Sequence, residues 1–224
     1  MLHKNSPKRI YFSGAVYYIV IKTGHNYPYF RETIFCDLFI ENLKICKKLK
    51  SFKLYGFSII YDHVNLMLEP NNEFDISQVM KSLKRNVSRN INIIMGYTND
   101  YPVQPVGHTI LCGLRGVGNV FKYKVFGLPS LNHGNKLYAW KFDIEHYKNL
   151  FTDKFKGEIL YPKFKWQRKF YDHYIRFHEN HLRQEKDWDN HYDYTVFNHL
   201  KHGLPENWQY TSINFPELID YLDS

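Results

Sequence analysis

A histidine and an amide stand two residues apart in an apolar stretch of this chain, at His63 and Asn65. The stretch predicts a strand over 63–69, in which residues two apart face the same way. An imidazole nitrogen and an amide oxygen on one face can bind the same divalent ion. Mg²⁺ and Mn²⁺ favour oxygen ligands, and Mn²⁺ also accepts imidazole. Alone, this spacing is more often a hydrogen-bonded surface pair than a metal site.

A tyrosine and a second amide stand four residues apart near the carboxyl end, at Tyr194 and Asn198. The pattern predicts a helix over 180–200, on which residues four apart share a face. A tyrosine hydroxyl can attack a phosphodiester when a metal ion polarises the phosphate, and Asn198 could supply a further ligand. This pair is also weak evidence alone, since other tyrosines have the same chemistry: Tyr171, Tyr174 and Tyr192.

Four strands and three helices must position these residues. Alternating or β-branched runs predict strands over 15–22, 52–61, 63–69 and 170–177. Apolar residues at helical spacing predict helices over 31–50, 76–94 and 180–200, and Asp75 with Gln78 forms a capping-box pattern. The order strand-helix-strand-strand-helix-strand-helix predicts an α+β fold: a ferredoxin-like or RRM-like antiparallel sheet with helices packed on it.

The stretch between the second helix and the fourth strand is rich in glycine and proline. We predict one domain, 1–224, with an insertion at about 97–165 before the last strand. Within the insertion, 120–126 is a candidate strand and 143–151 a candidate helix.

The formal net charge of +8 and the pI of about 9.2 favour a polyanionic partner such as nucleic acid. Basic residues on the helix over 76–94 could neutralise phosphates, or could be an ordinary solvated face: Lys81, Lys84, Arg85 and Arg89. Three cysteines without C-x-x-C spacing predict a reduced intracellular protein. No run has the length of a membrane span or the pattern of a signal peptide.

Five segments together resemble the single-tyrosine HUH transposases, and most closely the REP-associated tyrosine transposases of the IS200-like group. They lie at 62–70 (DHVNLMLEP), 76–84 (ISQVMKSLK), 166–176 (WQRKFYDHYIR), 194–204 (YTVFNHLKHGL) and 208–212 (WQYTS). The resemblance covers about 10–95 and 165–213, and it implies the HUH endonuclease fold.

The resemblance also implies a chemistry. Tyr194 would cleave single-stranded DNA beside a hairpin and keep the 5′-phosphate, with Mg²⁺ or Mn²⁺ held by His63 and Asn198. Arg176 would contact DNA. Such proteins act in the bacterial cytoplasm at the nucleoid, and the resemblance leaves both a monomer and a homodimer open.

Three departures from the family pattern bear on activity. Asn65 replaces the second histidine of the HUH motif, His199 replaces a proline, and the insertion is long. Asn65 can still offer a carbonyl oxygen, although a neutral amide binds metal less well than imidazole. Besides the transposase we therefore consider a catalytically impaired relative that binds structured DNA, and, third, a protein that binds or processes RNA.

Overall fold

The computed structural model describes residues 12, 14–97, 111–112, 123–124, 143–156, 158, 161–175 and 181–221, with the backbone alone at 111–112, 123–124 and 181–185. The chain divides into two compact units. The first consists of Met1–Ser88 with Phe164–Ser224, and the second of Arg89–Lys163.

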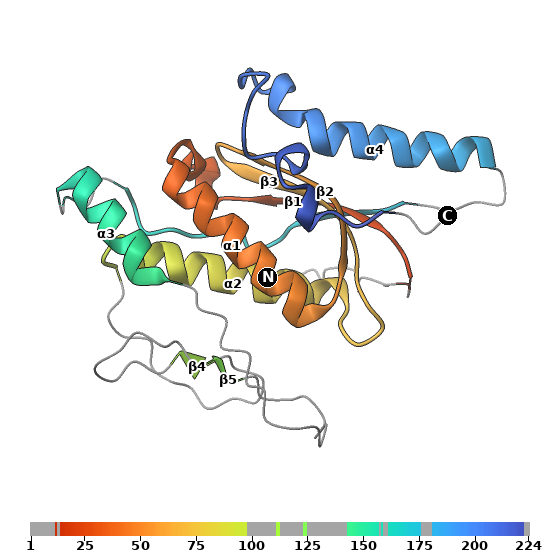
Figure 1. Ribbon diagram of the computed structural model, residues 1–224. Coiled ribbons are helices and arrows are strands. Elements are labelled where there is room, and N and C mark those ends of the chain that lie inside the picture. Colours follow the sequence, from red (N-terminus) through yellow and green to blue (C-terminus); the bar gives the residue numbers. More distant parts are fainter. Residues whose placement is uncertain are drawn as a thin grey trace, which may run out of the picture. The chain divides into compact units, whose positions relative to one another are not determined.

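The first unit is built on a four-stranded antiparallel sheet (Figure 1). Its strands are β1 (Tyr17–Lys22), β2 (Lys53–Ile60), β3 (His63–Glu69) and β6 (Tyr171–Tyr174), in the spatial order β2-β3-β1-β6. Helix α1 (Thr33–Lys50) connects β1 to β2, and α2 (Ile76–Ile94) follows β3. This strand order and connectivity are those of a ferredoxin-like sheet, so the predicted α+β fold class is confirmed.

The two faces of the sheet are covered by different helices. One face is apolar and fully buried, with Ile19, Ile21, Val64, Leu66 and Leu68 beneath α1 and the first part of α2. The opposite face lies under α4 (His181–Lys201), which packs on β2 and β3 (Figure 1). Alternation along β3 places His63 and Asn65 on this second face.

The second face also holds a small core beneath the first half of α4. Its buried members are Val16, Tyr18, Tyr55, Met67 and Ile175, with Trp188 and Tyr192 of α4 packed against them. The aromatic rings of this cluster fix how α4 crosses the sheet.

Local signals in the sequence account for several boundaries. The β2–β3 hairpin turns at Tyr61 and Asp62, as predicted. The capping box is present: Asp75 Oδ1 accepts from the Gln78 backbone N–H at 2.8 Å, and Gln78 Oε1 accepts from the Asp75 N–H at 2.9 Å. Strand β6 is shorter than the predicted 170–177, and 176–177 lie outside the described residues.

Short 3₁₀ helices complete the first unit. They are η1 (Gly24–Asn26), η2 (Tyr29–Arg31), η3 (Ser212–Asn214) and η4 (Pro216–Leu218). Lys47 Nζ pairs with Asp220 Oδ2 at 2.7 Å, which ties the tail to α1.

The second unit contains the end of α2, a two-stranded sheet of β4 (Leu111–Cys112) and β5 (Tyr123–Lys124), and α3 (Ile144–Phe155). The candidate strand over 120–126 is described only at Tyr123–Lys124, and the helix expected over 143–151 extends to Phe155. Within this unit the Tyr97 hydroxyl donates to the Tyr161 carbonyl at 2.6 Å.

None of the helices in the described part of the chain is long and apolar enough to cross a membrane.

Candidate active site

His63 opens β3 and is held in one orientation by its neighbour. Its Nδ1 lies 2.7 Å from Asp62 Oδ1, and its side chain is buried. Burial lowers the pKa of His63 below its ordinary value, although Asp62 acts in the opposite direction. A neutral His63 that donates its Nδ1–H to Asp62 keeps a lone pair on Nε2. That nitrogen is therefore prepared to accept a hydrogen bond or to bind a metal ion.

Asn198 of α4 meets that nitrogen from the other end of the chain. Asn198 Nδ2 lies 3.2 Å from His63 Nε2, and the side chain is fully buried. Its Oδ1 is buried without a hydrogen-bond partner among the described residues. Leaving such a carbonyl unpaired costs about 1–3 kcal/mol. A half-turn of the amide would aim this oxygen beside Nε2, so the pair fits a cation that accepts one nitrogen and one oxygen ligand.

Helix α4 can reach the sheet at this point because β2 carries a glycine there. A Cβ on Gly56 would lie 3.4 Å from Val196 Cγ2 and 3.6 Å from Thr195 Cγ2. Both α4 residues are buried, two and three positions before Asn198. The close approach of β2 and α4 thus sets the depth at which Asn198 stands over β3.

Asn65 lies on the same face as His63, and its amide is engaged at both ends. Its Oδ1 accepts from the Tyr18 hydroxyl at 3.0 Å, and its Nδ2 donates to Ser58 Oγ at 3.3 Å. Burial, followed by the neighbouring Tyr194 and Tyr171, raises the pKa of Tyr18 above its ordinary value. Tyr18 therefore stays protonated and remains a donor to Asn65.

Tyr194 stands one turn before Asn198 on α4, with 37% of its surface exposed. Its ring meets Tyr18 edge-on with centroids 5.9 Å apart, and Lys201 Nζ lies 4.1 Å from the ring centroid. The hydroxyl-bearing ring is thus held between a buried aromatic and a cation, within reach of solvent. The ammonium over the ring makes a cation–π contact with Tyr194.

Two neighbours of the predicted site residues were not predicted from the sequence: Lys201 beside Tyr194 and His202 beside His63. Lys201 follows Tyr194 by seven residues, which is two helical turns, and this spacing could have indicated it. The ring of His202 lies 4.8 Å from that of His63, and nothing in the local pattern predicts this contact. His199 is buried with its Nδ1 3.2 Å from the Val196 carbonyl.

The basic residues of α2 are not brought to this pair. Helix α2 lies on the opposite face of the sheet from α4, where Lys81 and Arg85 are exposed. Lys84 Nζ donates to the Gln167 carbonyl at 2.7 Å, and the Lys84 carbonyl accepts from Trp166 Nε1 at 3.0 Å. Lys84 therefore anchors the Trp166 segment to α2.

The two remaining predicted DNA contacts cannot be placed relative to this pair. Arg89 belongs to the second unit, and Arg176 lies outside the described residues.

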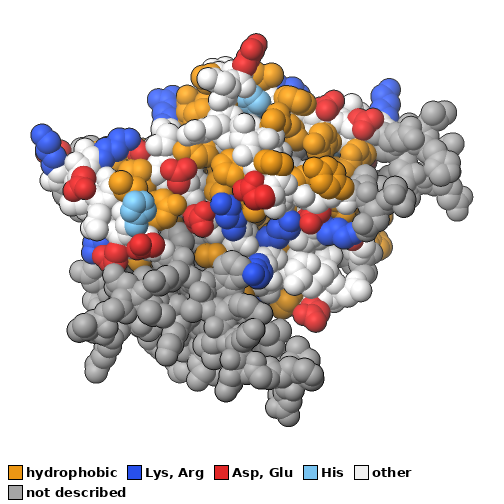
Figure 2. Space-filling model, viewed as in Figure 1, with side chains coloured by type: hydrophobic (Ala, Val, Ile, Leu, Met, Phe, Trp, Pro, Cys, Tyr) orange, Lys and Arg blue, Asp and Glu red, His pale blue; other side chains and the backbone are white. Residues whose placement is uncertain are grey.

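On the face drawn in Figure 2, Lys and Arg side chains are interspersed with Asp and Glu, so the net charge of +8 is not gathered on that face.

Residues 12–101 match the family model described as "Transposase IS200 like". Over these residues, called here the IS200-like segment, the chain is similar to that family. The match confirms the predicted resemblance over 12–101. The IS200-like segment includes His63 and Asn65, whereas Tyr194 and Asn198 lie beyond it.

Comparison with solved structures finds a similar fold in one transposase structure. The REP-associated tyrosine transposase bound to a REP hairpin aligns with 98% of this chain and 92% of its own, at 14% identity and a TM-score of 0.52. A candidate transposase from Deinococcus radiodurans R1 aligns with 83% of this chain and 95% of its own, at 11% identity and a TM-score of 0.37. None of the curated proteins matches the chain.

Proposed function

We propose that this protein is a transposase that cleaves and rejoins single-stranded, hairpin-bearing DNA through Tyr194. The observation that carries the proposal is the buried pair of His63 Nε2 and Asn198, 3.2 Å apart, one helical turn from an exposed tyrosine. The IS200-like segment supports it, as does the net charge of +8. The solved structure of similar fold is a tyrosine transposase bound to a REP hairpin, and we extend that class of partner to this chain.

The proposed reaction is a transesterification at one phosphodiester. The Tyr194 oxygen forms a bond to phosphorus, the bond from phosphorus to the 3′ oxygen breaks, and the 3′ oxygen takes up a proton. Tyr194 retains the 5′-phosphate and loses its hydroxyl proton to solvent. Because one phosphodiester replaces another, the step needs no external energy source and can reverse on a second strand.

His63 and Asn198 would hold a divalent ion, Mg²⁺ or Mn²⁺. Asp62 fixes the tautomer of His63, and Asn198 offers the buried oxygen that lacks a protein partner among the described residues. Asn65 could add a third ligand, because its carbonyl oxygen has a second lone pair beyond the one that accepts from Tyr18. When bound, such an ion polarises the scissile phosphate and stabilises the leaving oxygen.

Cations of the chain would orient the DNA. Lys201 stands beside Tyr194 and would contact the phosphate under attack. Further predicted contacts at Lys81, Arg85, Arg89 and Arg176 would bind phosphates away from the cleavage point, whereas the Lys84 ammonium is held by the Gln167 carbonyl.

The proposal is tested with a labelled DNA hairpin that carries a single-stranded flank, incubated with Mn²⁺ or Mg²⁺. We expect a covalent protein–DNA adduct that resists denaturation, and its loss in Tyr194→Phe. Tyr192→Phe, two residues away on the same helix, is the matched control and should keep the adduct. An adduct that survives Tyr194→Phe contradicts the assignment of the nucleophile.

A catalytically impaired DNA-binding relative is the second candidate, favoured by the engagement of Asn65 with Tyr18 and Ser58. That protein would bind the hairpin with metal-independent affinity and form no adduct. Asn65→His would then create cleavage or raise it greatly, because it supplies the second imidazole. Cleavage by the unaltered chain would exclude this candidate.

A further inference from the structure

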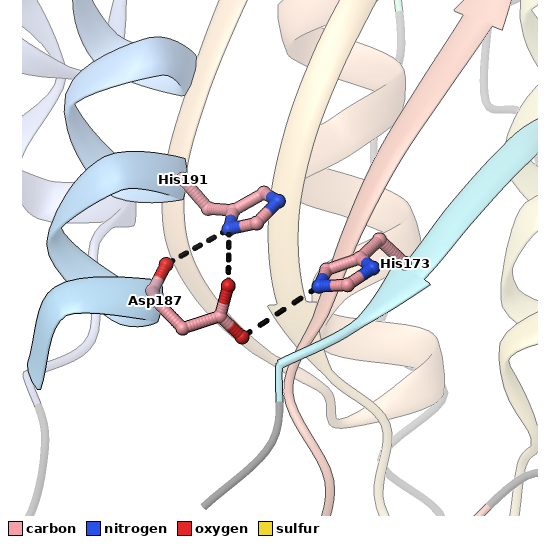
Figure 3. A group of neighbouring side chains, drawn as sticks. All are labelled: His173, Asp187 and His191. Carbon is pink, nitrogen blue, oxygen red and sulfur yellow. Dashed lines mark hydrogen bonds and ion pairs between the residues drawn. The ribbon is translucent and has the colours of Figure 1, made fainter. Parts of the chain in front are cut away.

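Three side chains converge on a point between β6 and the first half of α4, away from the His63–Asn198 pair. They are His173, Asp187 and His191, and one ligand atom from each lies within 4.8 Å of the other two (Figure 3). His173 Nε2 is 3.6 Å from Asp187 Oδ2, and His191 Nδ1 is 3.2 Å from Asp187 Oδ1. The three side chains are between 23% and 34% exposed, so solvent reaches the cluster.

The topology brings these residues together. Asp187 and His191 are four apart and share one side of α4. His173 is paired in register with Tyr18 on the sheet face that α4 covers, and Figure 3 shows its ring turned toward Asp187. Proteins use the same four-residue helical spacing to place two side chains on one metal ion, with a third ligand supplied by another element.

The hydrogen bonding leaves the cluster with nitrogen and oxygen donors. His191 Nδ1 lies 2.8 Å from the Asp187 backbone carbonyl, so Nδ1 carries a proton in the metal-free chain and would release it on binding the ion. His173 Nε2 is buried without a hydrogen-bond partner among the described residues. Two imidazoles and one carboxylate form a three-ligand set typical of Zn²⁺, with the fourth position open to water.

Binding of an ion would change the orientation of one of the two imidazole rings. The two imidazoles are stacked, with centroids 4.5 Å apart and planes 11° from parallel. Ring lone pairs lie in the ring plane, so a shared ion requires one imidazole to turn about its Cβ–Cγ bond, a broad torsion of low cost. Bonds of about 2.0 Å to a tetrahedral ion also require ligand atoms about 3.3 Å apart. His191 Nδ1 lies 3.2 Å from one Asp187 oxygen, Oδ1, and His173 Nε2 lies 3.6 Å from the other, Oδ2.

We propose that His173, Asp187 and His191 form a binding site for a divalent transition-metal ion of the Zn²⁺ class, which ties β6 to α4. The site is about 10 Å along α4 from the ligand Asn198, since seven residues separate His191 from Asn198. Tyr194 lies between the two sites, and the Tyr18 ring contacts both His191, at 5.2 Å, and Tyr194, at 5.9 Å. An ion in this site would fix the helical turn that presents Tyr194. The relevance of that turn to cleavage rests on the proposed function, whereas binding of the ion does not.

Binding is measured on the full chain with Zn²⁺ alone and without DNA, by equilibrium dialysis. The double variant His63→Ala/Asn198→Ala removes the other pair, and we expect it to retain one Zn²⁺ per chain. Adding His173→Gln or His191→Gln should weaken that binding by roughly tenfold or more. His146→Gln, at an exposed histidine of α3, is the matched control and should leave binding unchanged.

A second measurement guards against misfolded variants. Asp187→Asn keeps the shape of the side chain, and its circular dichroism and thermal unfolding in chelator should match those of the parent. Both proteins carry the His63→Ala/Asn198→Ala background. Zn²⁺ should then raise the Tm of that double variant, and it should not raise the Tm once Asp187→Asn is added. Absence of Zn²⁺ binding in the double variant, or binding that His173→Gln leaves unchanged, would overturn the proposal, whatever the outcome of the DNA-cleavage test.

Discussion

The chemistry of this site depends on which His63 nitrogen carries a proton, and Asp62 decides that. Asp62→Asn replaces a charged acceptor with a neutral one and weakens the orientation of the ring. We expect the dissociation constant for Mn²⁺ at the His63–Asn198 pair to rise by roughly tenfold to a hundredfold. The measurement is electron paramagnetic resonance of free Mn²⁺, in a His191→Gln background that removes the second cluster.

Asp193→Asn is the control for this prediction, because Asp193 is exposed on α4 beside Tyr194. It removes the same charge without touching His63. Equal affinities in the two variants would mean that Asp62 does not prepare His63 for a metal ion.

Tyr18 is the residue on which Asn65 depends. Tyr18→Phe removes the hydroxyl that donates to the buried Asn65 carbonyl. We expect the free energy of unfolding to fall by about 1–2 kcal/mol in urea denaturation, since a buried acceptor loses its partner. Tyr171→Phe, at a residue 57% exposed, should change it by less than about 0.5 kcal/mol. A loss in Tyr18→Phe as small as that in Tyr171→Phe would show that the Tyr18 hydroxyl does not stabilise Asn65.

Motif reasoning found His63, Asn65, Tyr194 and Asn198, because each lies in a short segment whose spacing carries meaning. The contacts of Tyr18 with Asn65 and of His202 with His63 could not be found that way. They depend on the strand register and on the direction in which α4 crosses the sheet, and both are properties of packing.

At the scale of elements, the depth of α4 over β2 controls the site. A Cβ at Gly56 would meet Val196 and Thr195 at ordinary contact distances, so Gly56→Ala should change the free energy of unfolding by less than about 1 kcal/mol. Gly56→Leu places further carbons into α4 and should cost about 1–3 kcal/mol by overpacking. It should also lift Asn198 from His63 and lower the affinity for Mn²⁺ in the His191→Gln background.

Comparison of the two substitutions is the internal control. If Gly56→Leu binds Mn²⁺ as tightly as Gly56→Ala does, then the approach of β2 to α4 does not set the position of Asn198. Urea denaturation of both variants separates a local displacement from a general loss of folding.

Helical periodicity could be read from the sequence where burial is one-sided, whereas β2 and β3 are buried on both faces. Helix α2 shows this clearly: Val79, Met80, Leu83 and Val87 are fully buried at helical spacing, and the capping box at Asp75 marks its start. Strand β6 was predicted less well, because only four residues pair with β1 and their burial is partial. A short edge strand leaves too few alternating positions to fix its ends.

At the scale of the molecule, the fold class followed from the order of the elements along the chain, but the placement of the basic helix did not. The sequence shows that α2 has a basic face and cannot show which side of the sheet that face occupies. The structure puts α2 and Tyr194 on opposite sides of the sheet. Under the proposed function, electrostatic binding by α2 and cleavage by Tyr194 would therefore be served by separate surfaces.

This separation predicts that affinity for DNA and the rate of cleavage can be changed independently. Lys81→Ala/Arg85→Ala removes two exposed cations from α2 and leaves the Tyr194 face untouched. We expect weaker hairpin binding and a slope of log K against log salt that is shallower by about 1.4–1.8, since each phosphate contact contributes about 0.7–0.9. At saturating DNA, adduct formation should proceed at the parental rate.

Lys148→Ala/Lys154→Ala on α3 lowers the net charge by the same two units and should leave the slope unchanged. Equal slopes in the two double variants would mean that the net charge, and not the face of α2, governs binding. A reduced rate at saturating DNA would instead mean that α2 and Tyr194 act on the same stretch of DNA.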